Sequence, residues 1–140
     1  MADPVAEGRP PRGVIDTSVL IDLEAIDPRT LPSEVAVTAI SMAELAAGPH
    51  AVGDAGERAR RQDRLQRAEA AFDALPFDAD AARAYGRVYA AVAAAGRKTR
   101  GARAVDLLIA ATALALELPL YTRHPDDFRH LGELLDVVAV

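Results

Sequence analysis

The feature that most constrains the fold is an almost wholly apolar stretch at residues 103–116, which contains a single carboxylate, Asp106. A segment that is apolar on every face is expected to form a helix buried inside the protein. It is shorter than the roughly 20 residues that cross a bilayer, so a membrane span is not expected. Asp106, near the start of such a helix, is either an N-terminal cap or a functional carboxylate, and the stretch alone leaves both interpretations open.

Length and composition predict one compact domain. The chain has 140 residues, which is enough for a single core. It has no cysteine, so a disulfide framework and a thiolate metal site are both excluded. Its net charge of −5 argues against binding nucleic acid over the whole surface but is compatible with a local basic patch.

The amino-terminal residues differ in character from the rest of the chain. Residues 1–12 are rich in proline, glycine and charge, and they are predicted to form a flexible tail before a folded domain at residues 13–140. The tail has no basic region followed by an apolar stretch, the pattern that marks a signal peptide. A cytoplasmic protein is therefore expected.

Short apolar runs alternate with helical patterns along the chain. Strands are expected near residues 13–16, 34–39, 119–122 and 137–140, with helices between them. Such alternation predicts an α/β fold, a three-layer α/β/α sandwich with a central parallel sheet. In these sheets, sites form beyond the carboxyl ends of the strands.

Acidic residues lie where such a site is expected. Asp16 follows the first strand, Glu44 lies one helical turn beyond the second, Asp106 opens the buried helix, and Asp126 follows the third strand. Each also has a structural explanation: Asp16 can cap the next helix, and Ser41 with Glu44 has the spacing of a capping box. Independent caps, however, do not require the acids to converge at one edge of the sheet.

Convergent carboxylates would favour a bound cation. Unpaired carboxylates repel one another and are unfavourable to bury, so a divalent cation is the expected partner. Oxygen ligands and the lack of cysteine indicate Mg²⁺, with Mn²⁺ as an alternative. Such sites commonly serve phosphodiester hydrolysis. The sequence has no P-loop and no dinucleotide-binding glycine motif, so nucleotide binding at the first turn is not expected.

Four motifs in order along the chain resemble those of PIN-domain ribonucleases, specifically the VapC-type toxins of type II (VapBC) toxin–antitoxin pairs. They are Val-Ile-Asp-Thr-Ser-Val-Leu-Ile (14–21), Ile-Ser-Met-Ala-Glu-Leu (40–45), Ala-Val-Asp-Leu-Leu-Ile-Ala-Ala-Thr-Ala (104–113) and Tyr-Thr-Arg-His-Pro-Asp-Asp-Phe (121–128). The resemblance covers residues 13–140. It implies a PIN-like parallel sheet, Mg²⁺-dependent endoribonuclease activity, a homodimer, and inhibition by a cognate VapB-type antitoxin whose carboxyl-terminal segment occupies the toxin groove.

The resemblance also implies residue roles. By position, it assigns three principal catalytic and metal-binding acids: Asp16, Glu44 and Asp106. For the fourth, many relatives place Asn or Asp directly after the Thr-Arg pair, where this chain has His124, and others use the acid two residues later, here Asp126. We expect Asp126 to complete the site, with Asp127 a surface or capping residue and His124 a candidate phosphate contact. This departure leaves open whether one or two cations bind.

Two further expectations concern RNA and the dimer. A basic segment precedes Asp106, and it either holds the RNA backbone beside the metal or is an exposed loop without a role; its residues are Arg97, Lys98, Arg100 and Arg103. Tyr85 and Tyr89, at helical spacing, are expected core or dimer-interface residues. The alternative to a nuclease is a catalytically degenerate PIN-like module that binds RNA or protein, and metal-dependent cleavage distinguishes the two.

Overall fold

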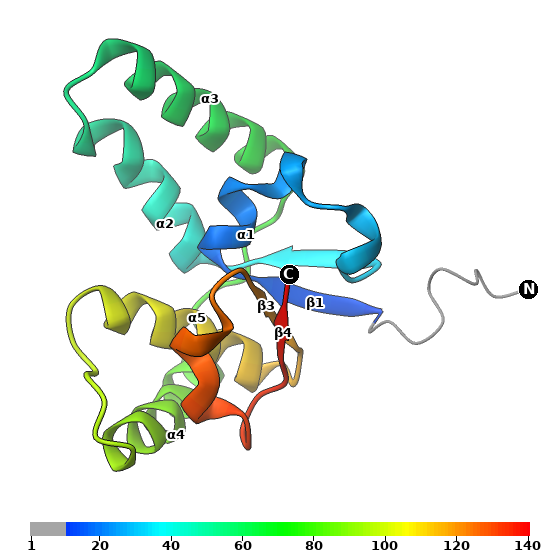
Figure 1. The fold of residues 1–140 in the computed structure, drawn as a ribbon, viewed down its shortest axis with the longest axis vertical. Helices are drawn as coiled ribbons and strands as arrows, with labels where there is room; N and C mark the ends of the chain where they lie inside the picture. The colour runs from blue at the N-terminus through cyan, green and yellow to red at the C-terminus, as the bar shows by residue number, and fades with distance from the viewer. Residues whose placement is uncertain (1–10) are drawn as a thin grey trace, which may run out of the picture.

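The computed structural model describes residues 11–140, which form a parallel sheet covered by helices on both faces (Figure 1). The strands are β1 (Arg12–Ile15), β2 (Glu34–Val37), β3 (Leu120–Thr122) and β4 (Val137–Ala139). Their order in the sheet is β2-β1-β3-β4, and every neighbouring pair is parallel. The predicted three-layer α/β fold is confirmed. Residues 1–10 of the predicted tail lie outside the described residues, and Arg12 already belongs to β1.

The helices connect the strands and cover the sheet. They are α1 (Thr17–Ile21), α2 (Ala39–Ala47), α3 (Ala55–Ala71), α4 (Ala79–Ala94) and α5 (Ala102–Ala115), with short 3-10 helices η1 (Leu23–Ala25), η2 (Pro28–Thr30), η3 (Gly48–Ala51) and η4 (Pro125–Leu131). Helices α1 to α3 lie on one side of the sheet and α4 and α5 on the other (Figure 1). Within residues 11–140, no helix is both long and apolar enough to cross a membrane.

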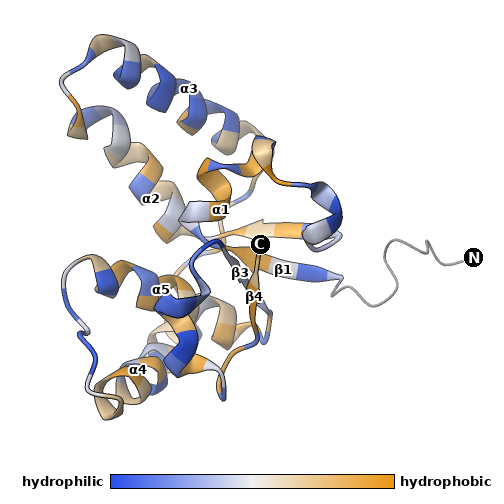
Figure 2. Ribbon diagram, in the orientation of Figure 1, coloured by the Kyte–Doolittle hydropathy of each residue, from blue (hydrophilic) through white to orange (hydrophobic). Residues whose placement is uncertain are grey.

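Successive strand residues point into two separate cores. The sheet residues buried against α4, α5 and η4 are Val14, Ala36 and Leu120. The sheet residues buried against α1 to α3 are Ile15, Val37 and Tyr121. Strand side chains alternate between faces, so burial on both faces requires a continuous apolar run. Figure 2 shows these strands as hydrophobic ribbons between the helical layers.

Helix α5 is the buried helix expected from the sequence. Leu107, Ile109 and Ala110 on it are fully buried. The helix begins at Ala102, after Gly101 with a φ of 70°, a left-handed conformation that favours glycine. Asp106 therefore lies inside the helix, in its second turn, and its interpretation as an N-terminal cap is wrong.

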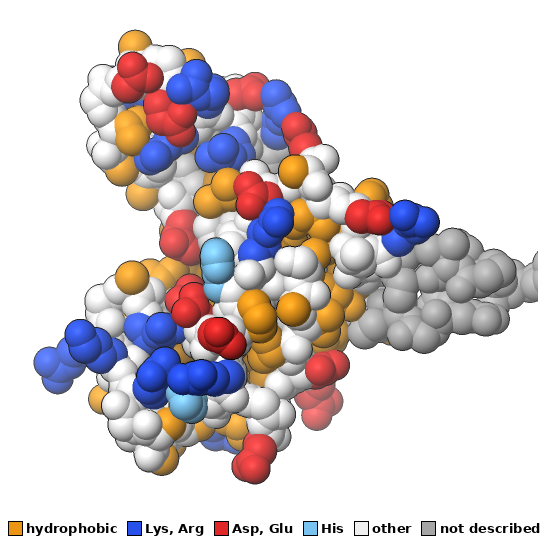
Figure 3. Space-filling view, viewed as in Figure 1, with side chains coloured by type: hydrophobic (Ala, Val, Ile, Leu, Met, Phe, Trp, Pro, Cys, Tyr) orange, Lys and Arg blue, Asp and Glu red, His pale blue; other side chains and the backbone are white. Residues whose placement is uncertain are grey.

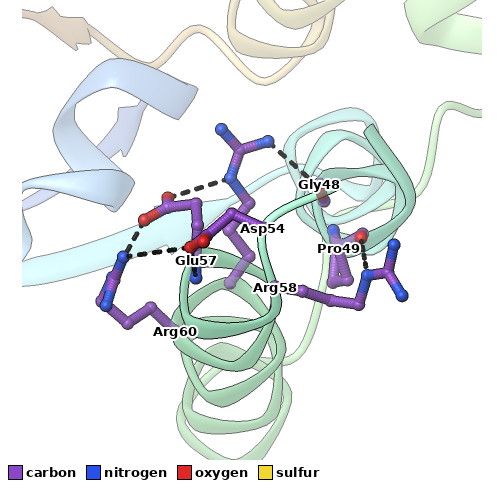
Figure 4. Close-up of polar contacts among 7 residues, drawn as sticks. Gly48, Pro49, Asp54, Glu57, Arg58 and Arg60 are labelled. Carbon is purple, nitrogen blue, oxygen red and sulfur yellow. Dashed lines mark hydrogen bonds and ion pairs between the residues drawn. The ribbon is translucent and has the colours of Figure 1, made fainter. Parts of the chain in front are cut away.

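The hairpin of α2 and α3 carries many of the charges, and its tip is held by arginines (Figure 4). Arg61 donates to the carbonyl of Gly48 at 3.0 Å, and Arg58 donates to the carbonyl of Pro49 at 3.1 Å. Glu57 accepts from Arg61 at 3.1 Å. These arginines satisfy carbonyls left open where α2 ends. These arginines therefore stabilise the tip of the hairpin.

Candidate active site

The site lies where the direction of strand addition reverses. The chain passes from β1 to β2 on one side, and β3 pairs with β1 on the other. In open parallel sheets, this reversal leaves a crevice beyond the carboxyl ends of the strands. Asp16 directly follows β1, and its backbone N–H donates to the carbonyl of Tyr121 in β3 at 3.0 Å. The first predicted acid thus lies at the carboxyl edge of the sheet, where this reversal occurs.

Asp16 is both a cap and an available ligand. Its carboxyl group is buried, and Oδ1 accepts from the N–H of Val19 at 3.1 Å and from the hydroxyl of Ser18 at 2.6 Å. The capping interpretation of Asp16 is therefore confirmed. Its other oxygen, Oδ2, forms no hydrogen bond within the described part of the chain. One oxygen fixes the side chain while the other is open to a cation.

Glu44 is held by a neighbouring helix. Helix α2 begins at Ala39, and the side chain of Thr38 caps it by accepting from the N–H of Ser41 at 3.1 Å. Ser41 is therefore inside the helix, and the interpretation of Ser41 and Glu44 as a capping box is wrong. Glu44 instead accepts a hydrogen bond from the hydroxyl of Thr17, at the start of α1.

Asp106 is the electrostatic centre of the site. Burial raises its pKa to about 6, and the nearby cation of Arg103 opposes that rise. The negative charges of Asp127, Asp16 and Glu44 raise the pKa further. Carboxylates shift one another in this way only when they lie close together. The charges of the acids that follow β1 and that lie on α2 and η4 therefore act on Asp106 in α5.

The acids after β3 differ in placement. Asp127 approaches Arg103, whose Nη1 lies 3.6 Å from Oδ1 of Asp127 and donates to its carbonyl oxygen at 2.8 Å. His124, Asp126 and Asp127 are all exposed. The side chain of Asp126 forms no hydrogen bond or ion pair within residues 11–140, and Asp127 is the one whose charge acts on Asp106. The identity of the fourth ligand stays a prediction, and the placement favours Asp127 over Asp126.

The basic segment shares a surface depression with the acids. The depression has a volume of about 700 Å³, and its lining residues are Gly96, Arg97, Lys98, Arg100, Ala102, Arg103, Asp106 and Asp127. Figure 3 shows Lys and Arg side chains gathered beside acidic ones over the α4 and α5 part of the molecule. Candidate phosphate-binding charges and candidate metal ligands thus face the same solvent space.

The chemistry of these donors fits a hard divalent cation. All are carboxylate oxygens, the ligands that Mg²⁺ and Mn²⁺ prefer, and Asp16 offers an open oxygen. As the side chains stand, no three His, Asp or Glu residues in the described part of the chain are close enough together to hold an ion. Binding would therefore draw the carboxylates closer.

Two positioning residues were not identified from the sequence, Thr17 and Ser18, because their pattern indicates only the start of a helix. Thr17 contacts Glu44, and Ser18 contacts Asp16. The hydroxyl of Ser18 also accepts from the N–H of Arg123 at 3.2 Å, so it links the ends of β1 and β3. Their position directly after Asp16 was the available signal.

The fold and site define an α/β domain with a carboxylate centre at the switch point of a parallel sheet. The sequence matches the PIN domain family over residues 13–134. It is 39% identical over 134 residues to Ribonuclease VapC5 of Mycobacterium tuberculosis, covering 94% of this chain and 96% of that protein. It is 36% identical over 110 residues to Ribonuclease VapC8 of the same species, covering 78% and 96%. The chain belongs to the PIN-domain family.

Solved structures agree with this assignment. The crystal structure of VapBC-5 from Mycobacterium tuberculosis, a member of the VapBC family of toxin–antitoxin systems, aligns with a TM-score of 0.81 at 36% identity, covering 94% of this chain and all (100%) of that one. VapBC2 from Rickettsia felis aligns with a TM-score of 0.73 at 19% identity, covering 92% and 98%. The second likeness shows the fold alone.

Proposed function

We propose that this protein is an endoribonuclease that hydrolyses RNA phosphodiester bonds and acts as the toxin of a type II toxin–antitoxin pair. The observation that carries the proposal is the geometry around Asp16: Glu44 bonds to Thr17, the residue after Asp16, and the charges of both acids reach Asp106. The relatives named as ribonucleases match most of the chain, which supports the same activity here.

We propose that Asp16 and Asp106 are the principal ligands of a divalent cation, Mg²⁺ or alternatively Mn²⁺. Glu44 and Asp127 complete the shell, with Asp126 as the other candidate. A cation bound there would supply an activated water and would neutralise charge that develops on the phosphate. The chain contributes orientation, because Asp16 is held by its cap bonds and Glu44 by Thr17. Water adds to phosphorus as the bond to the leaving oxygen breaks, which gives two RNA fragments.

The basic segment is proposed to hold the RNA backbone. Arg97, Lys98 and Arg100 are exposed, and they line the same depression as Asp106. Each RNA phosphate that the protein no longer neutralises should flatten the dependence of log affinity on log salt by ~0.7 for a single strand. A variant neutralised at these positions and at Arg103 tests the proposal. An unchanged salt slope would mean that the segment has no role in binding.

We propose that a cognate VapB-type antitoxin binds the α1 and α3 side of the molecule. A groove of about 460 Å³ lies there, with Leu20, Ile21 and Phe72 among its apolar lining residues. Ile21 is 44% exposed, and together with its apolar neighbours it forms a surface that a partner would cover. Growth arrest should be relieved by co-expressing the antitoxin, and Ile21→Glu should prevent that rescue while RNA cleavage continues.

A homodimer is proposed through α4. Tyr89 is 43% exposed, and its ring lies 6.1 Å from that of the half-buried Tyr85. Aromatic side chains of this kind are enriched in interfaces. Sedimentation of wild type and Tyr89→Glu tests this assignment. A wild-type mass equal to the 14.8 kDa monomer at micromolar concentration would contradict the dimer.

The proposed activity is tested with purified protein and total RNA. The buffer should resemble the cytoplasm, because we expect the toxin to act in that compartment. Fragments should appear with Mg²⁺ or Mn²⁺ and disappear with a chelator. Asp16→Asn is the matched inactive control. RNA bound but left intact in the presence of either cation would instead favour the non-catalytic PIN-like binding module.

A further inference from the structure

We propose that Arg103 is a built-in counter-cation of the acidic site: it pairs with Asp106 and Asp127 when no divalent cation is bound, and it turns to an RNA phosphate when the cation takes its place. This inference rests on the proposed function and deepens it. It makes metal binding and RNA binding depend on each other through one side chain.

The placement of Arg103 carries the inference. Its Nη1 lies 3.9 Å from Oδ2 of Asp106 and 3.6 Å from Oδ1 of Asp127. One nitrogen thus lies between carboxylates from α5 and η4, which are far apart in the sequence. The Arg103 side chain is 28% exposed, whereas Arg97 and Arg100 on the same segment are exposed. It is the basic residue of the segment that reaches the acids.

The contacts of Arg103 are of two kinds. Both carboxylate distances are longer than a hydrogen bond, so charge attraction dominates there and the carboxylate oxygens keep lone pairs for a cation. By contrast, the bond from Nη1 to the carbonyl oxygen of Asp127 is short, at 2.8 Å. A guanidinium has several donors. Nη1 makes all three contacts, so Arg103 can offer its other nitrogens, Nε and Nη2, to a phosphate while Nη1 stays anchored on the η4 backbone beside the site.

A divalent cation and Arg103 compete for the same negative charge. Once Asp106 binds a cation, its attraction for Arg103 is largely neutralised, and the two positive charges repel. Arg103 lines the depression that also contains Arg97 and Lys98, so a phosphate there is the available partner. Linkage then requires that RNA, by engaging Arg103, favours cation binding to the same extent that the cation favours RNA.

Calorimetric titration of Mg²⁺ into the full chain without RNA tests the competition. Arg103→Gln should bind Mg²⁺ about fivefold more tightly than wild type, because two weak charge pairs no longer oppose the cation. Arg100→Gln is the matched control, since it removes a like charge from the same segment without a carboxylate contact, and its affinity should equal that of wild type. Arg103→Lys keeps the charge, and its Mg²⁺ affinity should lie between those of wild type and Arg103→Gln.

The second part of the proposal is that Arg103 engages RNA only when a cation is bound. Binding of a labelled single-stranded RNA in the presence of a chelator tests it. Without metal, Arg103 is already paired with acids, so Arg103→Gln should bind RNA about as tightly as wild type does. Arg100→Gln should bind it more weakly. Equal losses of RNA affinity in the two variants would overturn the proposal.

A melting curve of each variant checks that it is folded. If Arg103→Gln unfolds early, Arg103→Met, which keeps the apolar stem, replaces it. An unchanged Mg²⁺ affinity in a folded neutral variant would refute the counter-cation role while leaving the nuclease intact. A wild type that binds no Mg²⁺ or Mn²⁺ would instead overturn the proposed function, so the two failures are distinguishable.

Discussion

The hydroxyl of Thr17 donates a hydrogen bond of 2.5 Å to Oε1 of Glu44, joining the first residue of α1 to the middle of α2. Because Asp16 directly precedes Thr17, this bond sets Glu44 relative to Asp16. Glu44 is an exposed residue, and a free glutamate side chain samples many rotamers. Thr17 is thus a positioning residue for a proposed metal ligand.

Thr17→Val and Thr17→Ser should separate this role from packing. Valine keeps the shape but loses the donor, so the kcat of RNA cleavage should fall about tenfold as Glu44 loses its fixed orientation. Serine keeps the hydroxyl and should cleave RNA nearly as wild type does. The free energy of unfolding of Thr17→Val should fall by about 1 kcal/mol at most. Equal kcat in the two variants would remove Thr17 from the mechanism.

Asp16→Asn should separate the cap from the charge. Asparagine caps a helix about as well as aspartate does, so the melting temperature should change little. Cleavage and toxicity should nevertheless be lost, because the amide does not replace a carboxylate as a cation ligand. Asp16→Ala should lose both the helix cap and the cation ligand, and its free energy of unfolding should fall by ~1 kcal/mol. Retained cleavage by folded Asp16→Asn would exclude Asp16 as a ligand.

Protonation of Asp106 should control the pH dependence of cation binding. Its pKa is raised from 3.8 to about 6, chiefly by burial. A carboxyl group must lose its proton to bind a cation, so Mg²⁺ affinity should fall as the pH drops below about 6 and level off above that value. Calorimetry across this range measures the effect. Affinity that is flat between about pH 5 and pH 7 would contradict the placement of Asp106.

The same shift predicts a change in stability without metal. The folded state holds the Asp106 proton more tightly than the unfolded state does. Protonated Asp106 therefore stabilises the folded state fully below pH 3.8, and this stabilisation is lost as the pH rises through about 6. In chelator near neutral pH, Asp106→Asn should then be more stable than wild type by about 1 kcal/mol. This is well below the total that about 1.36 kcal/mol per pKa unit gives for the whole shift, because the Asp106 side chain is partly exposed to solvent. Added Mg²⁺ should stabilise wild type and not the variant. Melting curves with and without Mg²⁺ measure both effects.

Asp127→Asn and Asp126→Asn are matched neighbours that identify the fourth acid. Asp127 acts on the charge of Asp106 and pairs with Arg103, whereas the Asp126 side chain has no such contact within residues 11–140. We expect Asp127→Asn to weaken Mg²⁺ binding about tenfold and Asp126→Asn to leave it close to wild type. The reverse order in calorimetry would return the role to Asp126.

Gly13 allows the close approach of Tyr121 to β1. A Cβ at Gly13 would lie 2.5 Å from Cε1 of Tyr121, whose side chain is buried. Gly13→Ala should therefore lower the free energy of unfolding by ~1–3 kcal/mol. Gly86→Ala on α4 is the contrast, because nothing lies within 4 Å of its Cβ, and it should stabilise the helix by ~0.5–1 kcal/mol. Urea unfolding compares the two.

Local sequence patterns were enough to predict the layers of the fold and the elements that carry the acids. The alternation of short apolar runs with helical patterns predicted a parallel sheet covered on both faces, and the structure confirms it. The all-round apolar pattern predicted the buried α5, and the position of Asp16 after β1 predicted its place in the crevice. These features follow from local periodicity and from the parallel topology, both of which can be read along the chain.

How the acids are held, and which of them meet, depends on tertiary packing. Helix α5 begins four residues before Asp106, so the charge lies inside the helix, where no cap signal reveals it. Asp126 and Asp127 are adjacent in sequence, yet only Asp127 meets Arg103, because the packing of the elements places Asp127 of η4 beside Arg103 of α5. Such contacts join residues far apart in the chain, and their distances depend on how whole elements pack, which no local pattern encodes.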